Sequence, residues 1–188
     1  MTPDATRRWR TTARLAVGVG VALAVLAVAA WAFGVRVNYT SSLPRGLYVA
    51  SAFDPASAGP GQIVAACPSA DAAAALAPYL ANGPCPGGVV ELGKPLAGLP
   101  GDTVVVDSVG VRVSGTPLPN SAPLFRDRTG NSLRPRLGRH VLGEGEYWLH
   151  SGRVPTSVDS RYAGPVSAVR GVLRPIWVEG EVRDAAGG

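Results

Sequence analysis

The chain has 188 residues, and 18 basic against 13 acidic side chains give it a formal net charge of +5. About 35 residues form an N-terminal segment, and the remainder suffices for one compact domain rather than two. Outside that segment the basic residues are scattered and no helix-turn-helix, zinc-finger or RNA-binding signature occurs, so we expect no nucleic acid partner.

The N-terminal segment couples a basic start to an apolar run. Four arginines precede the run: Arg7, Arg8, Arg10 and Arg14. Residues 15–35 carry no charge, and a helix of this length spans about 30 Å, the thickness of a bilayer core. The positive-inside bias predicts a cytoplasmic segment at 1–14, a single transmembrane helix at 15–35 in the cytoplasmic membrane, and a body on its outer, periplasmic side. A cleavable secretory signal is the alternative, because alanine-rich apolar runs also serve that purpose.

The body, residues 36–183, is predicted to be mainly antiparallel β-sheet. Short apolar stretches alternate with glycine and proline, which is typical of strands separated by turns. The predicted strands are 46–50, 62–66, 103–106, 109–113, 147–150 and 166–172. Residues 184–188 are polar and rich in glycine, so we expect a flexible tail there.

A cluster of hydroxyl side chains follows the apolar run. Residues 38–48 read Asn-Tyr-Thr-Ser-Ser-Leu-Pro-Arg-Gly-Leu-Tyr, and Pro44 and Gly46 restrict the turn. A serine nucleophile at this place would work close to the bilayer surface. Hydroxyl-rich turns usually bond only to their own backbone, so the segment alone does not establish catalysis.

Cys67 and Cys85 are the only cysteines in the chain. An exported domain can hold them as a disulfide, and closing a loop of about 19 residues contributes roughly 3 kcal/mol in the chain-entropy model. Two unpaired thiols are the alternative. A metal site would need more ligands nearby, so we expect none. Between the cysteines, Ser69 is placed to cap a short helix that ends at Leu76.

Lys94 is the only lysine in the chain. Because arginine keeps its proton at physiological pH, an amine that acts as a general base must be Lys94 or the chain terminus. An apolar strand could bury the Lys94 amine and lower its pKa, which would let it deprotonate a serine. A solvated surface lysine is the alternative. A Pro-Gly-Asp turn at Gly101 and Asp102 leads on into strand 103–106.

A third polar segment runs from Ser157 to Pro165 and places Asp159 and Arg161 two residues apart. In a strand both side chains would project from the same face and could pair to brace a loop. An exposed ion pair worth under about 1 kcal/mol is the alternative. The two histidines lie in no pattern that sets them beside a particular serine or carboxylate, so we do not expect a Ser-His-Asp triad.

Together these segments resemble the signal peptidase I superfamily, and most closely its branch of TraF-like conjugal-transfer peptidases. The features that carry the resemblance are Asn38-x-Thr40-x-Ser42-x-Pro44-x-Gly46-x-Tyr48, the Cys67 to Cys85 insertion with Tyr79, Lys94 before Pro100-Gly101-Asp102, and Ser157-x-Asp159-Ser-Arg161-Tyr162-x-Gly164-Pro165. They cover nearly the whole body. Ala163 departs from the pattern, which often has an aromatic residue at that place.

The resemblance implies a signal-peptidase-like β-fold and a serine endopeptidase that uses a Ser/Lys dyad. Ser42 would be the nucleophile and Lys94 its general base. Ser157 would hydrogen-bond to the lysine amine and orient it, while Asp159 and Arg161 would brace the site.

The same resemblance assigns supporting roles around the nucleophile. Thr40 would supply an oxyanion-hole donor alongside the Ser42 N–H. Spacing to Pro44 and Gly46 favours Ser42 over the adjacent Ser41.

The predicted reaction needs no metal or cofactor. Its expected partners are the cytoplasmic membrane and an exported precursor protein, and the resemblance implies a conjugative pilin of a type IV secretion system, processed by hydrolysis or by cyclisation. A non-catalytic, membrane-anchored scaffold is one alternative, in which the serine and lysine are present but not aligned. A self-cleaving Ser-Lys repressor-like protease is another, against which the apolar anchor and the cysteine pair argue.

Overall fold

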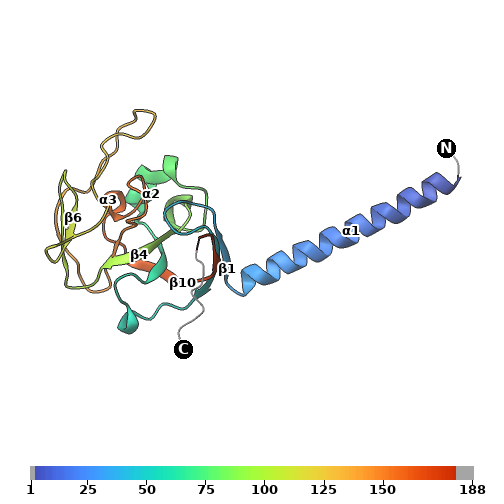
Figure 1. Cartoon of the computed structure of the whole chain (residues 1–188), viewed down its shortest axis with the longest axis horizontal. Helices are drawn as coiled ribbons and strands as arrows, with labels where there is room; N and C mark the ends of the chain where they lie inside the picture. Colours follow the sequence, from blue (N-terminus) through green and yellow to red (C-terminus); the bar gives the residue numbers. More distant parts are fainter. Residues whose placement is uncertain (1–2, 181–188) are drawn as a thin grey trace. The chain divides into compact units, whose positions relative to one another are not determined.

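The computed structural model describes residues 3–180, and its backbone separates into an N-terminal unit that ends at Arg36 and a body that begins at Val37. The N-terminal unit contains one long helix, α1 (Pro3–Ala32) (Figure 1). The helix ends where Gly34 adopts a φ of 81° and donates its N–H to the Trp31 carbonyl, a common way for a helix to stop.

Residues Thr12–Ala32 of α1 are long and apolar enough to cross a membrane. The apolar helix predicted at 15–35 therefore exists, but α1 begins earlier, at Pro3, and ends at Ala32, because Gly34 breaks it. The segment predicted at 1–14 is largely helical, and its first two residues lie outside the described part of the chain. The tail predicted at 184–188 also lies outside the described residues.

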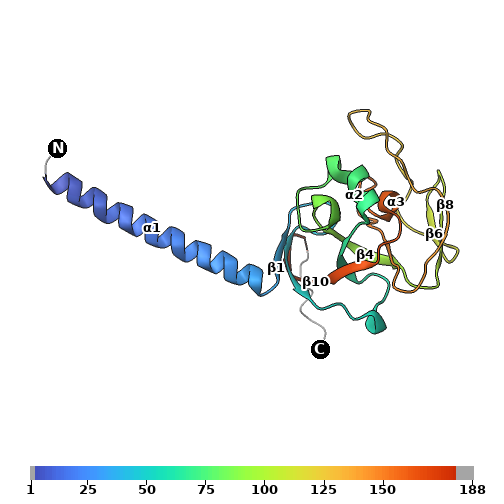
Figure 2. The same cartoon turned by 180° about the vertical axis from the view of Figure 1, so that it is seen from behind.

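Antiparallel strands form two sheets, as the sequence predicts for a mainly β body. The larger sheet has the strand order β1-β2-β10-β3-β4-β9, and the smaller has β7-β6-β5-β8, with β6 and β8 visible together in Figure 2. The strands are β1 (Val35–Asn38), β2 (Gly46–Ser51), β3 (Ile63–Cys67), β4 (Leu92–Gly98), β5 (Thr103–Val106), β6 (Val111–Val113), β7 (Thr116–Pro117), β8 (Gly138–Val141), β9 (Trp148–Leu149) and β10 (Ala168–Val178).

The two sheets bury separate apolar clusters. The larger sheet packs with α2 (Ala70–Leu76) and α3 (Ser160–Ala163), two short helices that contact each other and lie side by side in both views (Figures 1 and 2). The smaller sheet packs its valines around the fully buried ring of Trp148. In β4 every second residue is buried, so one face of this strand points into the protein.

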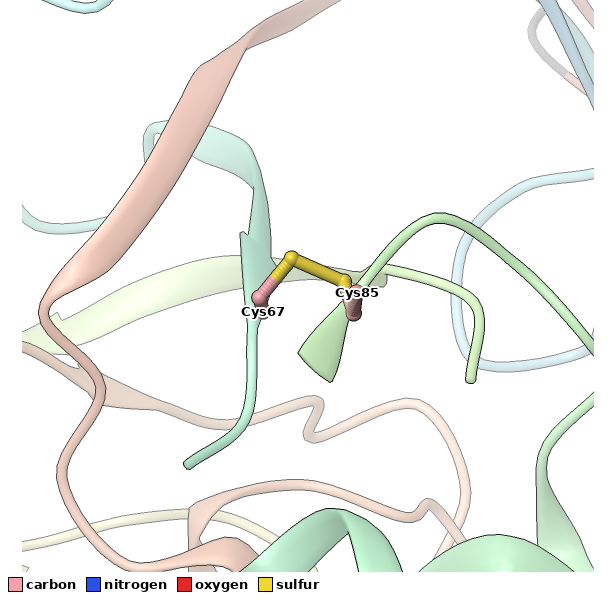
Figure 3. Close-up of a disulfide and its surroundings, with 2 residues drawn as sticks. All are labelled: Cys67 and Cys85. Atoms are coloured by element: carbon pink, nitrogen blue, oxygen red, sulfur yellow. A yellow bond between two sulfur atoms is a disulfide. The ribbon is translucent and has the colours of Figure 1, made fainter. Parts of the chain in front are cut away.

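The predicted disulfide between Cys67 and Cys85 is formed (Figure 3). It joins the end of β3 to the start of a 3₁₀ turn, η3 (Pro86–Gly88), and the intervening chain carries α2 and a second turn, η2 (Ala77–Tyr79). Ser69 caps α2 as predicted, since its Oγ accepts the Ala72 N–H. The disulfide therefore fastens a short helical insertion to the larger sheet.

Some strand boundaries differ from the prediction for local reasons. β10 continues to Val178, well beyond the predicted end at 172, because an irregularity between Pro175 and Trp177 lets the ladder pass the proline. β6 begins at Val111 and not at 109, because Asp107 accepts the N–H groups of the two preceding residues in a turn. The predicted strands did not include β1, β4, β7 or β8, although an apolar strand was considered around Lys94. β8 exposes most of its side chains and so lacks an alternating pattern.

Candidate active site

The loop between β1 and β2 carries the serine that the sequence favours as a nucleophile. The Asn38 side chain organises this loop: its Nδ2 donates to the carbonyls of Thr40, Leu43 and Pro44 at 3.0 to 3.1 Å. Tyr48 adds a hydrogen bond from its hydroxyl to the Pro44 carbonyl at 2.7 Å. These bonds satisfy the carbonyls of a tight turn and hold the backbone around Ser42 in place. Ser42 itself is buried, with 6% of its surface exposed.

Gly46 fixes where this loop enters β2. Its φ is +151°, and a Cβ at this position would lie 2.0 Å from the Trp177 carbonyl oxygen on β10. Only glycine allows the two backbones to approach so closely. Gly46 therefore sets the position of the nucleophile loop against the central strand of the larger sheet.

Lys94 lies on the buried face of β4, beside Val64 of β3. Its Nζ is 2.6 Å from Ser42 Oγ, and the residue is 7% exposed. Burial is the main cause that lowers the pKa of Lys94 from 10.5 to about 8; Asp159 raises this pKa and Arg161 lowers it, both through weaker charge interactions. The amine is thus in contact with a serine hydroxyl and holds its proton weakly.

The structure separates the two adjacent serines. Ser42 is buried against Lys94, whereas Ser41 is exposed and makes no hydrogen bond to the lysine among the described residues. Thr40, which is also exposed, lies with its Oγ1 3.2 Å from Ser42 Oγ. The same Oγ1 is 2.7 Å from Asn38 Oδ1, an atom that can only accept, so the Thr40 hydroxyl donates to Asn38 in this arrangement.

Asp159 and Arg161 form a fully buried ion pair. Arg161 Nε lies 2.8 Å from Oδ1 of Asp159 and Nη2 lies 3.0 Å from Oδ2, a two-pronged geometry. The predicted pairing exists, but the residues are not in a strand: Asp159 caps α3 and accepts the Arg161 N–H. Burial alone would raise the pKa of Asp159, but the nearby His150 ring and the hydrogen bonds from Arg161 hold it below its usual value.

Arg161 also ties two loops together, the one after β7 and the one before α3. Its guanidinium donates to the carbonyls of Ala122, Pro155 and Ser157 at 2.9 to 3.1 Å. A buried guanidinium needs such acceptors because each unpaired N–H would cost free energy. The ion pair therefore braces the segment that lies behind Lys94.

Ser157 is buried, and its Oγ has no hydrogen-bond partner among the described residues. The hydrogen bond expected from Ser157 to the lysine amine is thus not formed in this arrangement. The hydroxyl remains available, since a buried and unsatisfied polar atom gains free energy from any partner that reaches it.

Two residues that sequence reasoning did not assign complete the site. Ser151 donates from Oγ to the Ser42 carbonyl at 2.5 Å, which fastens the loop after β9 to the nucleophile. His150 has Nδ1 3.3 Å from Asp159 Oδ2 and Nε2 2.8 Å from the Pro119 carbonyl. His150 therefore supports the carboxylate and does not touch Ser42. No sequence spacing indicated either contact, because Ser151 and Ser42 are 109 residues apart and His150 meets Asp159 only where the intervening loop folds back.

The predicted turn at Gly101 and Asp102 supports the C-terminal end of β4. Asp102 Oδ2 accepts the Leu99 N–H at 2.8 Å, and Oδ1 accepts the Ser114 hydroxyl at 2.7 Å. Gly101 has a φ of 91°, which suits glycine in such a turn. These contacts link β4 to the smaller sheet. No group of three or more metal-binding side chains occurs in the described part of the chain.

Comparison with known proteins assigns the chain to a family. The signal peptidase family, peptidase S26, matches residues 8–177. A plasmid transfer protein TraF of Escherichia coli is 38% identical over 176 residues, covering 89% of this chain and 97% of its own length. A probable conjugal transfer protein TraF of Sinorhizobium fredii is 40% identical over 148 residues, covering 77% of this chain and 76% of its own.

A conjugal transfer protein TraF of Agrobacterium tumefaciens is 36% identical over 166 residues, covering 85% of this chain and 92% of its own. Among solved structures, a signal peptidase I from Enterococcus faecalis is 23% identical with a TM-score of 0.38, covering 65% of this chain and 99% of that one. The matched residues 8–177 include the serine loop, Lys94 on β4 and the Asp159–Arg161 pair. The chain belongs to the signal peptidase S26 family and has conjugal transfer proteins TraF as relatives.

Proposed function

We propose that the chain is a membrane-anchored serine endopeptidase in which Ser42 is the nucleophile and Lys94 the general base. The 2.6 Å contact between Ser42 Oγ and Lys94 Nζ carries this proposal, because it joins a hydroxyl to an amine of lowered pKa. Roughly a tenth of a group with pKa 8 is neutral at pH 7, against fewer than about one in a thousand for an exposed lysine.

The reaction begins when neutral Lys94 Nζ takes the Ser42 proton while Oγ attacks the carbonyl carbon of a peptide bond. The tetrahedral intermediate collapses as the ammonium returns its proton to the leaving amine, and an acyl-enzyme ester remains on Ser42. Lys94 then removes a proton from water as the water attacks the ester, and it returns this proton to Ser42 Oγ when the second tetrahedral intermediate collapses and releases the acid. If an amine of the substrate attacks instead of water, the product is a new peptide bond and the chain is cyclised.

In this mechanism the Ser42 N–H and the Thr40 hydroxyl stabilise the oxyanion. The Thr40 Oγ1 lies 3.2 Å from Ser42 Oγ, near the place where the carbonyl oxygen of a bound substrate would develop its charge. Rotation of the hydroxyl away from Asn38 Oδ1 turns its proton toward that oxygen. Replacing Thr40 by Val should lower kcat by about a hundredfold with little change in KM, whereas Thr40→Ser keeps the donor and most of the rate.

Ser157, Asp159 and Arg161 have supporting roles in the proposal. The unpaired and buried Ser157 hydroxyl is available to orient the lysine amine once Ser42 has been acylated and no longer holds it. Asp159 and Arg161 keep the surrounding loops in place and balance each other's charge near the amine.

We propose that α1 retains the enzyme in the cytoplasmic membrane with its N-terminus inside and the body on the outer side. The apolar stretch Thr12–Ala32 and the arginines at its N-terminal end support this topology. The disulfide between Cys67 and Cys85 suits the oxidising outer compartment. The substrate would then be an exported precursor protein that meets the enzyme at the membrane surface.

Relatives with the names of plasmid transfer and conjugal transfer proteins support a substrate in the conjugation apparatus, and we propose a pilin precursor. The test is cleavage of that precursor by membranes that carry the wild type, Ser42→Ala, Ser41→Ala or Lys94→Arg, followed by intact-mass analysis. Cleavage that is lost in Ser42→Ala and Lys94→Arg but kept in Ser41→Ala supports the dyad. A product lighter by one water than the hydrolysed chain indicates cyclisation. Equal cleavage by all four proteins contradicts the proposal.

A further inference from the structure

A pocket of about 270 Å³ opens beside the nucleophile. Its lining includes Ser41 and Leu43, the residues on either side of Ser42, together with Val154 from the loop after β9. Because Ser41 and Leu43 are the chain neighbours of Ser42, this pocket lies on the loop that carries the nucleophile.

The walls of the pocket are held by hydrogen bonds from both sides. Ser151 donates to the Ser42 carbonyl at 2.5 Å, and Asn120 Nδ2 donates to the Gly152 carbonyl at 2.7 Å, so the loop that carries Arg153 is fastened at two points. The Arg45 carbonyl accepts the Glu179 N–H at 2.8 Å. The backbone at or next to each charged lining residue is therefore held by hydrogen bonds within the protein.

Charge distinguishes this pocket from an ordinary surface hollow. Three charged side chains line it, Arg45, Arg153 and Glu179, which gives it a net charge of +1. In the described part of the chain neither arginine takes part in an ion pair, although both are exposed and lie beside a carboxylate-bearing residue. Leu43 and Val154 add apolar wall. Two guanidinium groups without an ion-pair partner, together with apolar lining side chains, match a carboxylate on a short aliphatic stem.

We propose that this pocket is a specificity subsite for an acidic side chain of the substrate, placed within about three residues of the scissile bond. An extended chain advances about 3.3 Å per residue, so a side chain further along would pass beyond the pocket. This inference rests on the proposed function, since it takes Ser42 as the point where the substrate chain is held. Asp or Glu would be preferred to the matching amide, and Lys would be disfavoured.

An anionic lipid headgroup is the other source of negative charge near a membrane protein. The position of the pocket favours the substrate, because its lining includes both chain neighbours of the nucleophile and a loop that is hydrogen-bonded to the nucleophile's own carbonyl. Apolar wall beside the arginines also suits a side-chain stem better than a phosphate group. The experiment below separates the two sources.

The test measures binding to the full-length Ser42→Ala protein in detergent micelles, so that no turnover is needed. The probes are blocked decapeptides of alanine with a single Glu, Gln or Lys placed at each position in turn. We expect Glu at one or two neighbouring positions to bind about fivefold to tenfold more tightly than Gln, and the difference to shrink in high salt. Arg45→Gln with Arg153→Gln should abolish the preference, and Arg153→Glu should reverse it toward Lys.

The remote, exposed Arg139 on the smaller sheet provides the matched control: Arg139→Gln removes the same charge and should leave the preference unchanged. Glu179→Gln should strengthen the preference, because it removes the negative charge from the pocket. Equal binding of Glu and Gln peptides, or a preference that survives loss of both arginines, overturns the proposal. So does arginine-dependent binding to phosphatidylglycerol vesicles without any peptide preference, which would assign the pocket to lipid.

Failure of the proposed function has a different signature. One outcome is that the Glu preference depends on both arginines, while the wild type cleaves neither the peptides nor the precursor. This outcome supports the acidic subsite and contradicts the peptidase proposal. If the wild type cleaves Glu and Gln peptides at equal rates, the peptidase proposal stands and the subsite falls.

Discussion

Replacing Lys94 by Met should stabilise the protein while it abolishes activity. Burial lowers the pKa of Lys94 from 10.5 to about 8, and at 1.36 kcal/mol for each pKa unit the folded state loses about 3 kcal/mol whenever the amine is protonated. Methionine has a similar shape and no charge. After subtraction of about 1 kcal/mol for the lost hydrogen bond to Ser42, we expect the free energy of unfolding to rise by about 2 kcal/mol at pH 7.

The stability difference between the wild type and the methionine variant should change with pH. Between about pH 8 and pH 10.5 the unfolded chain still holds the lysine proton and the folded chain does not, so the stability of the wild type rises with pH through this range. The methionine variant lacks this titration. Its advantage over the wild type should therefore be largest below pH 8 and should disappear by about pH 10.

The assay is urea unfolding of the full-length protein in detergent, followed by tryptophan fluorescence at several pH values; of the four tryptophans only Trp148 is buried and becomes exposed on unfolding. Ser42→Ala is the control, because it keeps the buried amine and should keep the pH dependence. Lys94 is the only lysine, so a ¹³Cε-lysine label gives one NMR signal whose titration reports the pKa directly. A methionine variant that is less stable than the wild type at pH 7, with a parallel pH dependence, would refute the reasoning.

Three further predictions concern the pH profile, the nucleophile loop and the disulfide. Below pH 8, kcat/KM for a peptide substrate should rise about tenfold for each pH unit and level off above it as Lys94 loses its proton; a limb centred near pKa 6.5 would contradict this. Gly46→Ala should lower the free energy of unfolding by more than about 3 kcal/mol, since its Cβ would overlap the backbone of β10, whereas Gly61→Ala, with open space around it, should cost only about 1 kcal/mol in urea unfolding. Changing Cys67 and Cys85 together to Ser should cost about 3 kcal/mol in the same assay, and an unchanged midpoint would exclude a stabilising role for the disulfide.

The features that could be predicted from the sequence are those set by local chemistry or by composition. Ser69 as a cap needs only the residues that follow it, and two cysteines in an exported domain have one way to pair. Lys94 stood out because it is the only lysine, and the alternating pattern of β4 explains its burial. The mainly β architecture follows from short apolar stretches between glycines and prolines.

The features that could not be predicted depend on how the folded chain brings segments together. Ser151 bonds to the Ser42 carbonyl although the two residues are 109 positions apart in the sequence, and His150 meets Asp159 only because a loop folds back. The i, i+2 spacing of Asp159 and Arg161 suggested a strand. Instead, the carboxylate caps a helical turn and pairs with the arginine inside it, because Asp is favoured at such caps.

The bonds of Asn38 illustrate the same limit inside a short segment. The sequence motif contains Asn38, but only the closed loop reveals that one amide satisfies three carbonyls and one hydroxyl around the nucleophile. A linear spacing cannot specify the direction of a carbonyl. Chain geometry determines which of two adjacent serines meets the lysine, and it selects Ser42 over Ser41.

The central claim is that Ser42 forms a covalent intermediate that depends on Lys94, and trapping this intermediate tests it most directly. The wild type is mixed with the candidate pilin precursor, quenched in acid during turnover, and digested for peptide mapping by mass spectrometry. The account predicts an acyl group on Ser42 in the wild type and none in Lys94→Met or Ser42→Ala. Cleavage of the precursor with no acyl group on Ser42, or acylation that persists without the lysine, would contradict it.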